Sequence, residues 1–275
     1  METPSPFSDT RKNSMAATAV AVVILAVLGF AGWRFGWWRY GAFEGEPPIV
    51  VPSPTNTPLA TVPPKPSVPE AAVPPYTGIP VATLHADPGM VAAVSPATYQ
   101  ASKKELADLA TELAVEPDQP ALWKRVAYIK HFYNDHLGAR DAYEYVNRIA
   151  PTDSVAFYNL AVLYGYDLKE PERAKQKFET ALRLSAFDVS FYVGFANFYR
   201  EVMYDTAAAE RVLLDGFAKV PTDVGITSTL GMLYRDVGNV AKAIEFYEKT
   251  LAAKDLSSGE RAAIQAEVDR LRAKL

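Results

Sequence analysis

The chain has 275 residues and a formal net charge of −4, and its sequence contains no cysteine. The missing thiols exclude disulfides, thiolate zinc sites, cysteine-bound iron–sulfur clusters and covalently attached haem. The nearly neutral charge balance offers no basic field for nucleic acid, so we expect no nucleic-acid partner.

A short tail, residues 1–14, precedes a long apolar stretch. Residues 15–32 carry no charge, and Trp, Phe and Tyr side chains follow among Arg34 and Arg39. About 20 apolar residues span the hydrocarbon core of a bilayer, and aromatic and basic side chains favour the interface beyond it. We therefore predict a transmembrane helix with an aromatic belt over 15–40, in contact with the lipid bilayer.

A cleaved signal peptide is the alternative for this stretch. Arg11 and Lys12 would form its basic region, and residues 29–31 would form a small-residue cleavage site. The apolar stretch is long for a signal peptide, which favours the membrane anchor. Basic residues flank the stretch on both sides and leave its orientation open.

Residues 41–97 are predicted to be a Pro/Ser/Thr-rich extended linker. Residues 44–96 hold 14 of the 21 prolines. Such sequences form semi-rigid spacers with little apolar content, and they commonly separate an anchor from an outward domain. We therefore expect a single-pass membrane protein with a cytoplasmic N-terminus and an extracytoplasmic C-terminal domain.

The C-terminal two-thirds of the chain has an internal period. Asp118, Asp153, Asp188 and Asp223 stand 35 residues apart. A fixed period of this length indicates a solenoid of identical supersecondary units. Within each unit, small and large residues at helical spacing predict two closely packed antiparallel helices. These recurring patterns are Leu160-Ala161-x-x-Tyr164 with Ala174-x-x-x-Phe178, Phe195-Ala196-x-x-Tyr199 with Ala209-x-x-x-Leu213, and Leu230-Gly231-x-x-Tyr234 with Ala243-x-x-x-Tyr247.

On these residues the chain resembles the tetratricopeptide repeat (TPR) family. The resemblance implies an all-α fold, a right-handed α-solenoid of helix hairpins, with repeats over 119–256. The units are 119–153, which is divergent, 154–188, 189–223 and 224–256. Two of them carry an added residue in the inner turn, at 167–171 and 203–206, and the divergent unit has Lys130 where the family has a tyrosine.

Both ends of the stack are expected to be covered by capping helices. Over 98–118, Leu106, Leu109, Ala110 and Leu113 form one apolar stripe. Over 257–275, Ser257 and Glu260 have the spacing of a capping box, with Ala263, Ile264, Val268 and Leu271 predicted to point inward.

No catalytic motif is present in the sequence, and we expect neither an enzyme nor a cofactor. His131 and His136 are five residues apart, whereas metal-binding pairs on one helix are four apart. We therefore expect their imidazoles to point to different sides, to bind no metal and to belong to a polar turn between two helices.

The first helices of the units should line a concave groove that binds a protein partner, through mixed aromatic and basic contacts. The candidate residues are Lys124, Tyr128, His131, Tyr158, Asn159, Tyr166, Asn197, Arg200, Met232 and Arg235, with Val162 and Ser228 beside them. One branch of the family clamps a terminal carboxylate, but Tyr128, Ser190 and Gly194 depart from that clamp.

Two functions follow from this organisation. The first is a membrane-anchored interaction module that binds or organises a partner protein through the groove. The second is a structural accessory subunit of a multisubunit membrane complex, held by the transmembrane helix and the linker.

Overall fold

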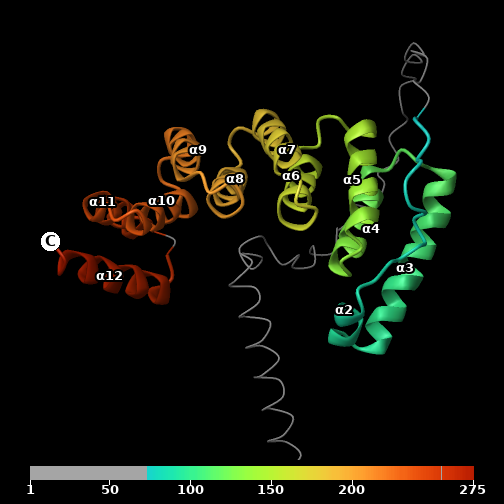
Figure 1. Cartoon of the computed structure of the whole chain (residues 1–275), viewed down its shortest axis with the longest axis horizontal. Coiled ribbons are helices and arrows are strands. Elements are labelled where there is room, and N and C mark those ends of the chain that lie inside the picture. Colours follow the sequence, from blue (N-terminus) through green and yellow to red (C-terminus); the bar gives the residue numbers. More distant parts are fainter. Residues whose placement is uncertain (1–72, 255) are drawn as a thin grey trace, which may run out of the picture. The chain divides into compact units, whose positions relative to one another are not determined.

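The computed structural model describes residues 73–254 and 256–275. Within these ranges the secondary structure is helical, without strands (Figure 1). None of the helices in the described ranges combines the length and the apolar character needed to cross a membrane. The predicted tail 1–14, the transmembrane helix 15–40 and linker residues 41–72 lie outside the described residues.

Four helix hairpins follow one another along the chain, and the two helices of each hairpin pack against each other. The hairpins are α4 (Pro120–Phe132) with α5 (His136–Ile149), α6 (Ser154–Val162) and its continuation η2 (Leu163–Asp167) with α7 (Pro171–Leu184), α8 (Val189–Glu201) with α9 (Thr206–Lys219), and α10 (Val224–Asp236) with α11 (Val240–Leu251). We call α4, α6, α8 and α10 the first helices and their partners the second helices.

The periodic aspartates mark the starts of first helices. The carboxylates of Asp153, Asp188 and Asp223 each accept a hydrogen bond from a backbone N–H of the first helical turn. An N-cap of this kind satisfies one of the donors that a helix start leaves open. Asp118 does not have this role, because α4 begins with Pro120 after an N-cap, Gln119, that makes no side-chain hydrogen bond.

The inner turn of each hairpin contains one residue with positive φ, and these residues are Asn134, Lys169, Tyr204 and Gly238. The N-cap of the second helix follows each of them directly. The extra residue of the two longer units lies before this point, at the end of the first helix. It is accommodated by the π-helical turn η2 in one unit and by a π-type bond from Met203 N–H to the Phe198 carbonyl in the other.

Small residues lie where helices cross, as the sequence predicts. Ala161 and Ala196 are buried. A Cβ atom on Gly231 would lie 2.7 Å from the ring of Tyr247, and one on Gly165 would lie 2.8 Å from the ring of Phe198. The two glycines therefore permit the close approach of neighbouring helices.

Helices cover both ends of the stack. In α3 (Pro96–Val115), Leu106, Leu109 and Leu113 are buried. In α12 (Ser258–Arg272), both halves of the predicted capping box form, and Val268 and Leu271 are buried. Ile264 is partly buried, but Ala263 is exposed, so the predicted inward stripe of α12 is narrower than expected.

Residues 73–97 differ from the expected extended linker. Helix α2 (Pro88–Ala93) forms within them, and α3 begins at Pro96. The preceding residues 73–87, which we call the strap, contribute to the core through Val81, which is 8% exposed. The proline content suggested a solvated spacer, but apolar side chains between the prolines find partners on α3, α4 and α5.

Candidate functional site

The predicted groove residues lie on the first helices, and most are partly exposed. We call this surface the first-helix face. Val162, Asn197 and Met232 stand 35 residues apart in three successive units, and each is partly exposed. Ser228 does not belong to the face, because it is buried and its hydroxyl donates to the Gly225 carbonyl at 3.2 Å.

Two tyrosines of the predicted set have different surroundings. Tyr128 is 50% exposed, with the guanidinium of Arg125 5.3 Å from its ring centroid. Tyr158 instead stacks on Phe191 at 4.7 Å, and its hydroxyl lies 2.1 Å from where a Cβ atom on Gly194 would be. Tyr158 is therefore a packing residue between two units, and Tyr128 is the ring presented at the surface.

The basic and polar groups at the start of the face are paired within the chain. The Lys124 ammonium lies 2.6 Å from the carboxylate of Asp153, the N-cap of the next first helix. Asn159 hydrogen-bonds the hydroxyl of the buried Tyr143, whose pKa is raised by burial. Both residues thus connect hairpin elements, and Lys124 is not positioned as part of a carboxylate clamp.

A row of polar contacts joins the ends of neighbouring first helices. Each contact links one unit to the next or to α12, and together we call them the polar row. Its members are His131 with Asp167 at 2.9 Å, Tyr166 with Glu201 at 3.4 Å, Arg200 with Asp236 at 4.0 Å and Arg235 with Glu267 at 3.8 Å. The predicted aromatic and basic anchors His131, Tyr166, Arg200 and Arg235 are thus brought into one line, each facing an acidic group.

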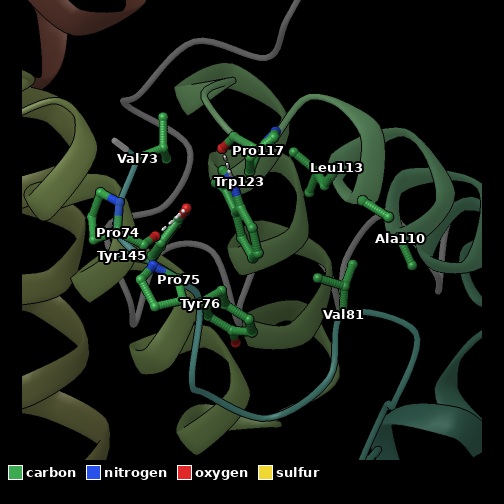
Figure 2. A pocket seen from close by; sticks show the side chains of 11 residues that line it. Val73, Pro74, Pro75, Tyr76, Val81, Ala110, Leu113, Pro117, Trp123 and Tyr145 are labelled. Atoms are coloured by element: carbon green, nitrogen blue, oxygen red, sulfur yellow. Dashed lines mark hydrogen bonds between the residues drawn. The ribbon is translucent and has the colours of Figure 1, made fainter. Parts of the chain in front are cut away.

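The strap forms a second candidate surface, packed on this chain's own helices. Tyr76 packs on Trp123 at 4.4 Å and on Tyr145 at 5.3 Å, and the Tyr145 hydroxyl donates to the Pro74 carbonyl at 2.9 Å. Figure 2 shows these side chains around a cavity of about 310 Å³ between the strap, α3 and the first hairpin. Its walls are mainly apolar and include Val73, the first described residue.

Lys130 explains why the first unit departs from the repeat pattern. Its side chain is fully buried and donates to the carbonyl oxygens of Pro80 and Thr83 in the strap. The Asp135 carboxylate lies 3.4 Å from the ammonium. Burial lowers the pKa of Lys130, and the charge of Asp135 opposes this shift. A tyrosine at this position would have no charge to offer these acceptors.

His131 and His136 lie together with Asp167, contrary to the expectation that the two imidazoles point apart. Their ring centroids are 5.8 Å apart, and one ligand atom from each of the three residues lies within 4.8 Å of the other two. The expectation applied the spacing rule for two histidines on one helix. His131 instead lies in the last turn of α4 and His136 begins α5, so the reversal of the chain brings the two rings to the same side.

Comparisons with known proteins agree with this architecture. Residues 228–254, in the last hairpin, match the tetratricopeptide repeat family model. The structure of PilW, a type IV pilus biogenesis factor, is similar with a TM-score of 0.50 and 14% identity, over 64% of this chain and 80% of PilW. No curated protein sequence matches the chain.

Two further solved structures are similar at lower scores. MamA has a TM-score of 0.46 and 15% identity, over 61% of this chain and 88% of MamA. A thermophilic TPR protein of Thermus thermophilus has a TM-score of 0.44 and 17% identity, over 64% of this chain and 94% of that protein. The repeat match and the likeness to PilW together support a tetratricopeptide repeat fold for the helical part of the chain.

Proposed function

We propose that this chain is a membrane-tethered interaction module whose first-helix face binds a segment of a partner protein. The observation that carries the proposal is the line of Val162, Asn197 and Met232, one residue from each of three successive units. Packed helices lie about 8–10 Å apart, which is close to one turn of a polyproline II segment, three residues at about 3.1 Å each. A partner peptide crossing the face would thus place every third side chain near one of these positions.

Charge at the edge of the face favours a partner segment with some acidic residues. Arg200 and Arg235 stand in the polar row, paired with Asp236 and Glu267, and each also contacts the carboxylate that follows it in sequence, at 3.1 Å for Glu201 and 2.7 Å for Asp236. Partly exposed ion pairs of this kind contribute about 0–1 kcal/mol, so an arginine can exchange its intramolecular partner for a carboxylate of the bound segment at little cost. Tyr128 adds a large exposed ring at the other end of the face.

The membrane part of the proposal rests on the apolar sequence of residues 15–40 and the proline-rich residues that follow. The anchor would hold the module at the bilayer, and the linker would set its reach. We propose no catalytic activity, since the polar groups of the first-helix face pair between units in an arrangement suited to binding.

A photo-crosslinking experiment tests the first-helix face directly. We would place a photoreactive amino acid at Asn197 of the full chain in its native cells, with the matched control at the exposed Gln176 on helix α7. A defined crosslinked protein is expected from position 197 and not from position 176. Equal crosslinking at both positions would contradict a specific surface.

The companion variants measure how much binding the face contributes. Val162→Asp with Met232→Asp should weaken capture of the crosslinked protein at least about 10-fold, because two apolar contacts are replaced by charges that oppose an acidic segment. Gln176→Asp with Leu214→Asp on the second helices is the charge-matched control. Circular dichroism must show equal helix content, and unchanged capture by the first pair would remove the face from the binding site.

The accessory-subunit function is the second candidate, and the strap favours it. Residues 73–87 pack on apolar side chains and accept a hydrogen bond from this chain's own helices, so this part of the predicted linker binds helical surfaces. If the linker residues before the strap also bind helices, the linker would attach this chain to the other subunits of a membrane complex. Replacing 15–72 by an unrelated anchor and linker should then abolish co-purification at fixed stoichiometry, whereas the first-helix variants should not.

A further inference from the structure

We infer that His131, His136 and Asp167 form a binding site for a divalent transition-metal ion such as Zn²⁺, at the junction of the first two hairpins. The inference goes beyond partner binding, because it assigns these three side chains to a metal. His131 lies in the last turn of α4, His136 is the first residue of α5, and Asp167 ends η2. Three separate elements therefore present the groups.

The donor set suits this class of metal. Imidazole nitrogen and carboxylate oxygen are ligands of Zn²⁺ at about 2.0–2.2 Å, and two histidines with one carboxylate recur in zinc sites that keep an open position. In a tetrahedral site such ligand atoms stand roughly 3.3 Å apart. The candidate ligand atoms lie within 4.8 Å of one another, and His131 Nε2 is 2.9 Å from Asp167 Oδ2. Small side-chain rotations would bring them to this spacing.

A second observation concerns one of the same three side chains. Nδ1 of His136 is buried and has no hydrogen-bond partner among the described residues. Buried polar atoms in folded proteins nearly always have a partner, and each exception calls for an explanation such as an ion. His136 therefore has coordinating capacity that the hairpin itself does not use.

The surroundings limit which ion can bind and how. All three side chains are partly buried, so a bound ion would keep access to solvent for a fourth ligand, such as a water molecule. Asp167 supplies one negative charge, which offsets part of the charge of a divalent cation. The absence of thiolates in the sequence disfavours softer ions such as Cu⁺.

Metal binding would link two repeats. The pair of His131 and Asp167 already connects the first unit to the second, and an ion held by all three groups would lock the first inner turn onto η2. A ligand that binds the folded state alone stabilises it by mass action. We therefore expect Zn²⁺ to raise the melting temperature and to protect the first two hairpins from proteolysis.

The test uses the full chain, purified in mild detergent without a polyhistidine tag and stripped of metal by a chelator. Isothermal titration with Zn²⁺ should show one ion per chain, and Co²⁺ should give the d–d absorption of a low-symmetry nitrogen–oxygen site. Asp167→Asn and His136→Ala should each weaken Zn²⁺ affinity by more than about 10-fold and abolish the Co²⁺ absorption.

His85→Ala is the matched control, since His85 is the third histidine of the chain and lies in the strap. This variant should bind Zn²⁺ like the parent, and helix content should be equal in all variants. Two results would overturn the inference. One is the absence of stoichiometric binding to the parent chain, and the other is affinity that remains unchanged in both Asp167→Asn and His136→Ala.

Discussion

The ammonium of Lys130 and the carboxylate of Asp135 form an ion pair that is almost completely removed from solvent, with 3.4 Å between Nζ and Oδ2. Lys130 lies in the last turn of the first helix of the first hairpin, and Asp135 caps the start of the second. The pair also holds the strap, because Lys130 donates to two strap carbonyls and Asp135 accepts from the His85 N–H at 3.3 Å. A single buried contact therefore joins the inner turn to the segment that leads toward the predicted membrane anchor.

Replacing Lys130 by methionine should lower the free energy of unfolding by about 3 kcal/mol. The variant keeps the apolar stem but leaves the buried Asp135 carboxylate without its countercharge and two strap carbonyls without their donor, a loss of the kind that costs about 3–5 kcal/mol. Urea unfolding measures the change. Lys104→Met, which breaks an exposed pair with Asp108, is the control and should cost less than about 0.5 kcal/mol. Equal midpoints for both variants would refute this role of the strap.

Two glycine substitutions should change stability in opposite directions. Gly231→Ala places a methyl group 2.7 Å from the Tyr247 ring, so overpacking should cost about 1–3 kcal/mol. Gly259→Ala in α12 meets no atom within 4 Å and should stabilise the helix by up to about 1 kcal/mol. Thermal unfolding followed by circular dichroism compares the pair. An unchanged melting temperature for Gly231→Ala would mean that the helix crossing at Gly231 is looser than the structure shows.

Features repeated in the sequence were predictable, because each depends on local rules. A 35-residue spacing of aspartates coincides with three N-caps, and small residues such as Ala161, Ala196 and Gly231 lie buried where helices cross. Ser257 and Glu260 form the capping box that their spacing indicates. Repeat periodicity and helix caps can be predicted from the local sequence, without knowledge of contacts between distant residues.

The strap and the histidine cluster were not predictable, because they depend on contacts between distant segments. Lys130 appeared only as a departure from the repeat pattern, and its acceptors lie 47 and 50 residues away. His131 and His136 meet because the chain reverses at Asn134, whose positive φ the sequence does not specify. In both places a tertiary contact outside the local pattern decides how the side chains are placed.

Stability should fall steeply above about pH 10, the ordinary pKa of tyrosine. Burial raises the pKa of Tyr164, and its hydrogen bond to Glu144 at 2.6 Å adds to the shift. Tyr164 thus stays protonated in the folded chain at a pH where it ionises in the unfolded chain. The contribution of Tyr164 to the free energy of unfolding is fully present below the pKa that this residue has in the unfolded chain. It decreases by about 1.4 kcal/mol per pH unit as the pH rises toward the pKa of Tyr164 in the folded chain.

Tyr164→Phe tests this dependence. The variant should show a smaller decrease of the free energy of unfolding between pH 10 and about pH 12 than the parent chain, whatever its stability at neutral pH. Tyr204→Phe, at a ring that is 84% exposed, is the matched control and should keep the parent slope. Parallel pH profiles for the parent chain and Tyr164→Phe would contradict the raised pKa.

Protease added outside intact cells should release the helical part of the chain, if residues 15–40 span the membrane with the C-terminal side outward. Glu44, Glu46 and Glu70 offer sites to a glutamate-specific protease between the predicted anchor and the strap. The packed strap and the buried pair of Lys130 and Asp135 should protect the chain from Val73 onward. The expected product is therefore one resistant helical fragment, detected by mass spectrometry. A chain with Glu44→Gln, Glu46→Gln and Glu70→Gln should remain attached, and complete protection of the parent until the cells are opened would place the helical part in the cytoplasm.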